Sequence, residues 1–242
     1  MIVRQASNVL ELLEYFAELK KPSTLPEISE AMGWPRSSTY NLLTTLAHRG
    51  YLYEPRPRGG YYPSTRWHAL VQSFGENELL PEALFSVVEE VAEMTGETVA
   101  VTGPARTNAV LLYVVESSAA IRFAAQVGNQ VPIHATASGR ALLAQYSPTE
   151  RASLLKKVEY VRYSSKSLMN AEEVEAQIRR ETERGWHENF EGHAADLAGI
   201  AMPVRLKERR LSVVVGGPSN RMQDRIPDIA EILKQALNRH GF

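Results

Sequence analysis

Residues 24–49 carry the pattern that most restricts how this chain can fold, because they define two short helices at a fixed spacing. Thr24 and Glu27 form a capping-box pair, in which each side chain can bond a backbone N–H of the other residue. Gly33 suits the left-handed position after a helix, so the first helix is predicted to stop there. Pro35 fits the start of a second helix that runs to the end of this range. Its predicted inward face carries Thr39, Leu42, Leu43 and Leu46.

A hairpin is predicted directly after these helices. The runs 51–53 and 60–62 are rich in tyrosine, and they flank a tip rich in proline, glycine and arginine. This is the pattern of two β-strands joined by a turn. Residues 6–19 have the apolar spacing of an amphipathic helix. Three short helices followed by a hairpin with a basic tip predict a winged helix-turn-helix over residues 1–66.

The remainder of the chain predicts a linker helix over 67–80 and an α+β domain over 81–242. Such a domain combines mostly hairpin-linked, antiparallel strands with flanking helices. Asn170 is placed to cap one of those helices, with acidic residues in its first turn. The predicted helices cover 81–95, 138–145, 170–184 and 227–239. The predicted strands cover 98–102, 109–116, 121–125, 199–205 and 211–216.

The composition restricts the class of protein. The 242 residues include no cysteine, which excludes disulfides and thiolate metal ligands and is typical of a reducing compartment. Glu11 and Glu14 interrupt the segment in which a signal peptide would need an apolar core. No apolar run approaches the roughly 20 residues that a membrane helix requires. We therefore expect a soluble, cytoplasmic protein that does not bind a membrane.

The exposed side of the helix after Pro35 and the hairpin tip have the chemistry to bind DNA. Arginine can donate to guanine and asparagine can bond adenine in the major groove, while arginines at a hairpin tip can reach the minor groove or the backbone. A net charge of -1 argues against a wholly basic nucleic-acid binder, so the placement of the cations decides more than their number. The alternative is an ordinary solvated helix face with a charged turn. The predicted DNA-binding residues are Arg36, Ser37, Ser38, Tyr40, Asn41, Thr44, Arg56 and Arg58.

A second candidate site lies at the turn 136–140, where small residues precede an apolar run. The turn is predicted to begin a helix, and the free backbone N–H groups at a helix N-terminus favour an anion. Ala137 and Gly139 would let a carboxylate approach the backbone. The alternative is a plain helix cap made by Thr136 or Ser138.

Over nearly its whole length the sequence resembles the IclR family of bacterial transcription regulators. The matching segments are LPEISEAMGWPRSSTYNLLTTLAHRGYL and GGYYPS in the first part, and MTGETVAV, VGNQVPIHATASGRALLA, RGW, GIAMPV and VVVGGPSNR in the second. The resemblance implies a homodimer or tetramer that binds double-stranded operator DNA. It also implies a GAF-like C-terminal domain that mediates oligomerisation and binds a small effector bearing a carboxylate. We expect a repressor of a catabolic operon, with no enzymatic activity and no cofactor.

The resemblance further implies where the effector binds, and the chain departs from the family pattern there. Gly199 stands at a position that is commonly cysteine, and Val214 and Gly216 stand where serines often occur. A less polar, roomier pocket suggests a larger or aromatic acid. The family often has an arginine where this chain has Asn41, so operator preference is not carried over. The predicted effector-binding residues are Ala120, Phe123, His134, Ala137, Ser138, Gly139, Asn189, His193, Leu197, Gly199, Val214 and Gly216.

Two other classes of protein stay open: an enzyme with an attached DNA-binding unit, and a structural DNA-binding protein without a sensor. The near-neutral charge counts against the second class. His134, His187, His193 and Asp196 could suggest a metal site, but their spacing matches no zinc signature, so a structural or pocket role is favoured. The sequence leaves open the effector, the operator, repression against activation, and dimer against tetramer.

Overall fold

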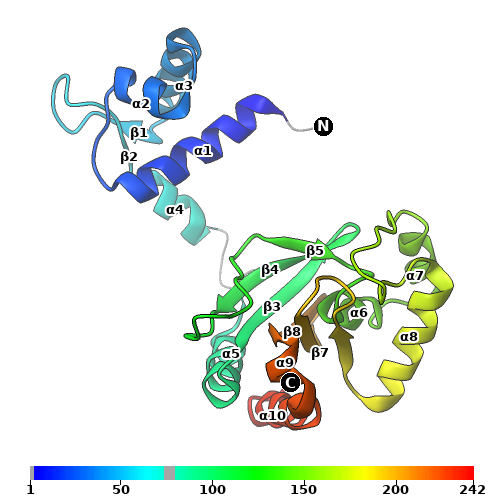
Figure 1. Ribbon diagram of the computed structural model, residues 1–242. Helices are drawn as coiled ribbons and strands as arrows, with labels where there is room; N and C mark the ends of the chain where they lie inside the picture. Colours follow the sequence, from blue (N-terminus) through cyan, green and yellow to red (C-terminus); the bar gives the residue numbers. More distant parts are fainter. Residues whose placement is uncertain (1–2, 74–79) are drawn as a thin grey trace. The chain divides into compact units, whose positions relative to one another are not determined.

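The computed structural model describes residues 3–73 and 80–242, which belong to two compact units (Figure 1). The smaller unit contains residues 3–73 and the larger unit contains residues 80–242. The linker helix predicted over 67–80 is present as α4 (Arg66–Ser73), and the rest of that prediction, over 74–79, lies outside the described residues. Each unit is described below by itself.

The smaller unit is a winged helix-turn-helix, as predicted. Its three helices share one core, in which Leu12, Ile28 and Leu43 are fully buried. The two strands of the wing are antiparallel, with Leu52 opposite Pro63. The elements are α1 (Arg4–Leu19), α2 (Leu25–Met32), α3 (Arg36–His48), β1 (Leu52–Tyr53), β2 (Tyr62–Pro63) and α4 (Arg66–Ser73).

The ends of α2 and α3 follow from the residues at the turn between them. Glu27 Oε2 accepts hydrogen bonds from the N–H and the Oγ1 of Thr24, at 2.7 and 2.8 Å. α2 ends at Gly33, whose φ of 65° is a left-handed conformation that glycine adopts without a steric penalty. The Pro35 carbonyl accepts a hydrogen bond from Thr39 Oγ1 at 3.1 Å, inside the first turn of α3. These contacts fix one face of α3 against the core and leave the opposite face exposed.

The larger unit is built on a six-stranded antiparallel sheet with the strand order β5-β4-β3-β8-β7-β6. In the centre, Val99 of β3 pairs with Val215 of β8. Side chains alternate between the two faces of a strand, and Val99, Val101, Val213 and Val215 are fully buried on one of them. The strands are β3 (Thr98–Ala105), β4 (Asn108–Val115), β5 (Gln130–Pro132), β6 (His187–Phe190), β7 (Leu197–Leu206) and β8 (Arg209–Pro218).

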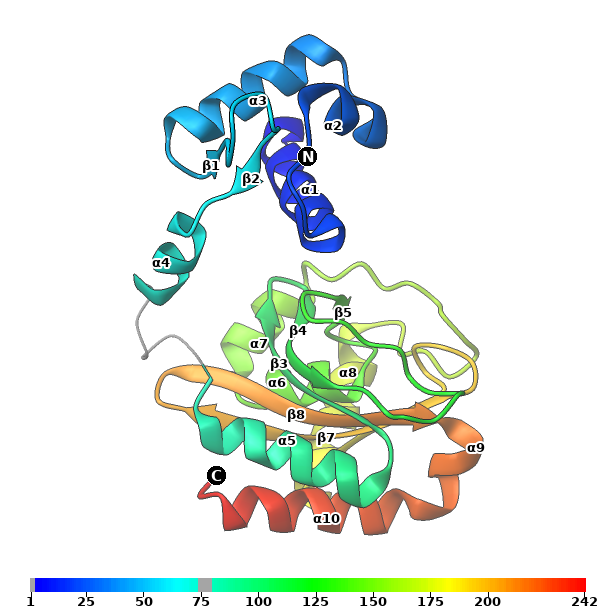
Figure 2. The same cartoon turned by 90° about the vertical axis from the view of Figure 1, so that its left-hand side faces the viewer.

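Helices cover both faces of this sheet (Figure 2). On one face, Val87 of α5 and Leu233 of α10 are fully buried against the valine layer. On the other face, Ala141 of α6 packs against Ala201 of β7. Within the described ranges no helix is long and apolar enough to cross a membrane. The elements are α5 (Glu82–Thr95), α6 (Ala137–Leu143), α7 (Pro148–Leu155), α8 (Ala171–Arg184), α9 (Ser219–Met222), η1 (Gln223–Arg225) and α10 (Ile226–Arg239).

The strand predicted over 121–125 is wrong. This segment is part of an irregular stretch, residues 116–125, that we call the strap. β4 pairs instead with the short strand β5. Side chains satisfy the strap's backbone groups, since Thr98 Oγ1 donates to Phe123 O at 2.7 Å and Glu116 Oε1 accepts from Ala125 N–H at 2.9 Å. These bonds replace the strand ladder that the apolar residues had suggested.

Candidate functional site

The first candidate site is the outward face of α3. All six residues predicted for DNA contact on this helix are exposed, and Tyr40 has 54% of its surface accessible. Thr39, Leu43 and Leu46 are buried on the inward face and hold the helix in place. The exposed residues are Arg36, Ser37, Ser38, Tyr40, Asn41 and Thr44.

Ser38 and Asn41 lie toward one side of this face. Together with Trp34 they line a groove whose lining also includes Val3 and the first residues of α1, beginning at Arg4. An asparagine there can offer both its donor and its acceptor to a partner outside the helix. The arrangement gives α3 hydrogen-bonding side chains across a broad exposed surface.

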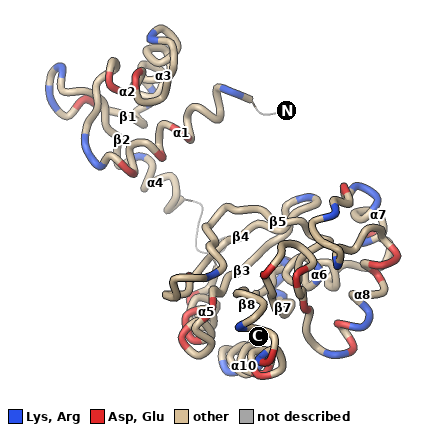
Figure 3. Tube along the Cα trace, viewed as in Figure 1, with Lys and Arg blue, Asp and Glu red and all other residues tan. Residues whose placement is uncertain are grey.

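The wing supplies the cationic part of the first site. Arg56 and Arg58 are exposed in the loop between β1 and β2, which Figure 3 shows with a blue segment. At the base of the loop, Gly60 has a φ of 84°, and a Cβ there would overlap the backbone of Ser23. Ser23 and Tyr61 exchange two backbone hydrogen bonds, at 2.8 and 3.0 Å. The wing is therefore anchored to the segment before α2.

The second candidate site is a cavity in the larger unit, with about 490 Å³ of empty space including its mouth. Most of its lining is apolar, and the polar side chains come from Thr102, Thr136, Ser138, Asn189 and His193. Within the described lining there is no lysine, arginine, aspartate or glutamate. Nine predicted effector-binding residues are brought together there: Phe123, Ala137, Ser138, Asn189, His193, Leu197, Gly199, Val214 and Gly216.

Small residues make room for the cavity on its side of the sheet. The Phe123 ring of the strap lies over Gly216, where a Cβ would come within 3.0 Å of the ring. Gly199 pairs with Gly216 across β7 and β8, so two neighbouring positions carry no side chain. Gly216 therefore lets the Phe123 ring, one wall of the cavity, lie close to the sheet.

The beginning of α6 provides one polar part of the lining. Thr136 caps the helix, since its Oγ1 accepts from Gly139 N–H at 3.1 Å and donates to Pro132 O at 3.0 Å. Ser138 Oγ lies 3.4 Å from Thr136 Oγ1. The plain-cap alternative is therefore present, and the capping residue itself lines the cavity. The hydroxyl groups of Thr136 and Ser138 are thus polar features of the lining at this point.

His193 and Asn189 provide the other polar part. The His193 ring packs on Tyr163 with 4.9 Å between the ring centroids, and burial lowers the pKa of His193. Asn189 is 9% exposed on the edge strand β6. A neutral imidazole and an amide can donate to a carboxylate without burying an opposite charge.

Three predicted effector-binding residues do not line the cavity. Ala120 is exposed on the strap, in a segment that is not a strand. Gly139 packs against the backbone of Ile133 so closely that a Cβ would overlap it. His134 is 1% exposed and packs edge-on against Tyr160. Their positions in the sequence beside lining residues therefore do not place these three residues in the lining.

Five lining residues were not predicted. One of them, Thr102, could have been found from strand alternation. Ala100 of β3 lies opposite the predicted residue Val214 of β8, and Thr102, two positions further along β3, is on the same face as Ala100. Thr136 belongs to the turn 136–140 that the sequence had singled out, whereas Leu111, Val131 and Ala198 come from contacts that only the folded sheet defines. The full set is Thr102, Leu111, Val131, Thr136 and Ala198.

A winged helix-turn-helix followed by a separate unit with a cavity is the arrangement of a class of DNA-binding transcription regulators. Residues 5–56 match the family model described as "IclR helix-turn-helix domain". Residues 77–239 match the model described as "Bacterial transcriptional regulator IclR C-terminal". The chain belongs to the IclR family of bacterial transcription regulators, and this confirms the resemblance found in its sequence.

Named relatives match along most of the chain. The acetate operon repressor of Salmonella typhimurium is 26% identical over 239 residues, which cover 97% of this chain and 87% of the relative. The transcriptional repressor IclR of Escherichia coli is 26% identical over 226 residues, covering 92% of this chain and 82% of the relative.

Solved structures share the fold. The Thermotoga maritima IclR structure superposes with a TM-score of 0.74 at 18% identity, and 98% of this chain and 97% of that chain are covered. An IclR homologue from Microbacterium hydrocarbonoxydans, complexed with 4-hydroxybenzoate, gives a TM-score of 0.72 at 21% identity, with coverage of 96% and 95%. At these identities the likeness shows the architecture alone.

Proposed function

We propose that this regulator is a repressor whose binding to operator DNA is controlled by a small carboxylic acid with an aromatic body. The single observation that carries the proposal is the lining of the cavity. An apolar wall that includes Phe123 and Val214 suits an aromatic ring, while the hydroxyl, amide and imidazole groups suit a carboxylate. The predicted effector-binding residues in the lining would make these contacts.

The relatives support the proposal without extending it. Two of them are named as repressors. One structural neighbour is complexed with 4-hydroxybenzoate, an acid of the proposed chemistry. We propose that the operon under control is catabolic for such an acid. A regulator that acts on the chromosome of a bacterium works in the cytoplasm, so we place the protein there.

On the DNA side, the proposal assigns base contacts to the exposed face of α3 and backbone or minor-groove contacts to the wing. One helix-turn-helix reads few base pairs, so a homodimer or tetramer that binds two half-sites is proposed. Selection of operator sequences from random DNA tests this directly. Two inverted half-sites spaced by whole helical turns are expected, and a single isolated half-site would contradict the proposed dimer.

Thermal-shift and calorimetric titrations test the effector class. Benzoate and 4-hydroxybenzoate are expected to raise the melting temperature and weaken operator binding, because the ring enters an apolar cavity. Pyruvate, glyoxylate and acetate should bind more weakly, since they leave the apolar wall uncovered. Tight glyoxylate or pyruvate binding without a response to aromatic acids would contradict the proposal. Recovery of the acid unchanged separates a regulator from an enzyme with a DNA-binding unit.

Val214→Ser locates the binding event. This substitution replaces apolar contact with a hydroxyl group in the lining, so benzoate should bind about tenfold more weakly, at about 1.4 kcal/mol per factor of ten. The matched control is Val161→Ser, at a position that is 40% exposed and outside the cavity lining. Equal affinities in Val214→Ser and the wild type would place the acid elsewhere.

A further inference from the structure

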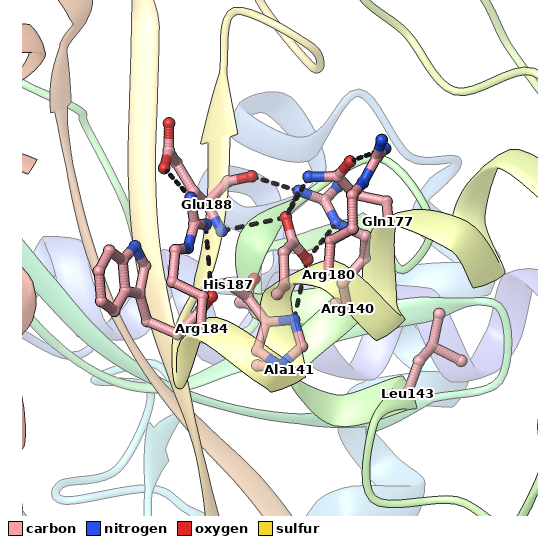
Figure 4. A network of polar contacts seen from close by, with 12 residues as sticks. Arg140, Ala141, Leu143, Gln177, Arg180, Arg184, His187 and Glu188 are labelled. Carbon is pink, nitrogen blue, oxygen red and sulfur yellow. Dashed lines mark hydrogen bonds and ion pairs between the residues drawn. The ribbon is translucent and has the colours of Figure 1, made fainter.

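A buried group of charges joins the two elements that supply polar residues to the cavity. β6 is an edge strand, so one side of its backbone lacks a neighbouring strand. The backbone groups of Glu188 on β6 are bonded instead by an ion pair, since Glu181 Oε1 accepts from Glu188 N–H at 3.2 Å and Arg140 Nη2 donates to Glu188 O. Figure 4 shows Arg140 reaching the backbone of Glu188, whose own side chain points to Arg184.

Arg140, on α6, makes the central contacts of this group. Its guanidinium binds the Glu181 carboxylate through two parallel hydrogen bonds, of 2.9 Å from Nε and 3.0 Å from Nη2. Nη1 also donates to His134 O at 3.4 Å, in the segment that leads into α6. The Arg140 and Glu181 side chains are 3% and 1% exposed. This two-pronged geometry is specific to arginine, because the ammonium group of lysine is a single point charge.

Glu181, on α8, is held ionised by its surroundings. Burial would raise its pKa, but the hydrogen bond from His187 and the charge and hydrogen bonds of Arg140 outweigh it and lower the pKa of Glu181 to about 2. His187 Nδ1 lies 2.9 Å from Oε2, and Gln177 Nε2 donates to Oε1 at 2.8 Å. The ionised carboxylate therefore has a donor on every side.

The group borders the cavity on two sides without lining it. Asn189, which lines the cavity, directly follows Glu188 on β6. Ser138, which also lines it, lies on α6 two residues before Arg140. One ion pair thus spans the distance between the Asn189 amide and the first turn of α6.

We propose that Arg140 and Glu181 are positioning residues for the effector cavity, and that they hold Asn189 in register with the start of α6. The inference rests on the proposed function, because it makes the ion pair a determinant of affinity for an aromatic acid. Loss of the pair allows β6 to move relative to α6, so the donors that face the carboxylate no longer converge.

The test compares a single and a double variant of the full chain. Glu181→Gln leaves a buried guanidinium without its counter-charge, so it is expected to lower both stability and affinity. The double variant Arg140→Met with Glu181→Leu removes both charges and fills the space with apolar groups. Replacement of a buried pair in this way often preserves stability. Its melting temperature should therefore lie above that of Glu181→Gln, although below that of the wild type because the Glu188 backbone and His187 lose their partners. Its affinity for 4-hydroxybenzoate should stay at least tenfold below that of the wild type.

Glu175→Gln is the matched control. It breaks the ion pair that Glu175 of α8 makes with Arg151 of α7, at 2.7 Å, outside the cavity lining. This variant should bind the acid like the wild type. A double variant that folds and binds 4-hydroxybenzoate with wild-type affinity would overturn the inference.

Amide hydrogen exchange separates failure of this inference from failure of the proposed function. If the wild type binds none of the tested acids, the proposed function is wrong. Exchange of the amides of residues 187–190 still measures whether the ion pair holds β6 in place. Exchange there should be at least tenfold faster in the double variant than in the wild type and unchanged in Glu175→Gln. Wild-type protection of these amides in a folded double variant would overturn the positioning role.

Discussion

His134 is the residue whose surroundings differ most from what its sequence position suggests. It lies beside the residues that line the cavity, yet its ring is 1% exposed, and neither ring nitrogen has a hydrogen-bond partner among the described residues. Burial, followed by the charges of Arg140 and His193, lowers the pKa of His134 to about 4. A neutral imidazole is the form that such a site tolerates.

This pKa predicts a stability change in acid. The unfolded chain takes up a proton near pH 6.5 and the folded chain near pH 4, so the stabilisation from neutral His134 is present above pH 6.5 and is lost as the pH falls from 6.5 to 4. In His134→Phe, the fall in unfolding free energy from pH 7 to pH 5 should be smaller by about 2 kcal/mol. Urea unfolding at both pH values measures it. The control is His48→Gln, at an exposed position, and equal pH dependence in His134→Phe and the wild type would contradict the assignment.

Arg36 is the residue that best separates base recognition from general attraction to DNA. It is exposed at the first position of α3. If Arg36 bonds a guanine, Arg36→Ala should weaken binding to the operator about ten- to hundredfold, as expected for a contact of roughly 1–3 kcal/mol. Binding to random DNA should change much less. Fluorescence anisotropy with both duplexes decides the point, because an equal loss on both would make Arg36 a phosphate contact.

At the level of elements, helix ends were predictable because their signals are local. Asn170 caps α8 by accepting from Glu173 N–H at 2.9 Å, as its sequence pattern predicts. β6 was not predicted, because its sequence His187-Glu188-Asn189-Phe190 is mostly polar. His187 is nevertheless 2% exposed, since Glu181, six residues earlier in the last turn of α8, accepts its hydrogen bond. A strand whose polar side chains are buried by ionic partners carries no apolar alternation.

The cavity shows the same division between local and tertiary signals. Its two glycines on β7 and β8 and the turn into α6 follow from recognisable motifs. Leu111 and Val131 reach the lining because β4 and β5 pair at the edge of the sheet. The position of the strap, by contrast, depends on the side-chain bonds of Thr98 and Glu116 to its backbone. No periodicity in the strap itself encodes those bonds.

The wing is the element whose role can be measured through salt. If Arg56 and Arg58 contact phosphates, Arg56→Gln with Arg58→Gln should weaken binding to operator and random DNA by similar factors. The slope of log affinity against log salt should also fall in magnitude by about 1.8, because each lost phosphate contact contributes about 0.9. Titrations at several salt concentrations measure both effects. An unchanged slope with altered operator preference would instead indicate minor-groove recognition by the wing.

For the whole molecule, the proposed effect of the acid on DNA binding is a coupling free energy between two ligands of one chain. Such a coupling is reciprocal, so each ligand must change the affinity for the other by the same factor. If saturating 4-hydroxybenzoate weakens operator binding by a given factor, saturating operator must weaken 4-hydroxybenzoate binding by the same factor. Factors of about 5 to 150 are typical of such coupling. Anisotropy with and without acid gives the first factor, and calorimetry with and without operator duplex gives the second.

Arg36→Ala is the control variant for this coupling. Its cavity is intact, so it should bind the acid like the wild type. At operator concentrations too low for the variant to bind DNA, added operator should no longer change its affinity for the acid. Unequal factors in the wild type would show that a third equilibrium is linked to both ligands. The first such equilibrium to measure is the association of chains. A dimer or tetramer that forms only on DNA would make acid binding depend on protein concentration. If the two coupling factors are equal at each of two protein concentrations, the regulation of DNA binding by the acid is a conformational change within a preformed oligomer.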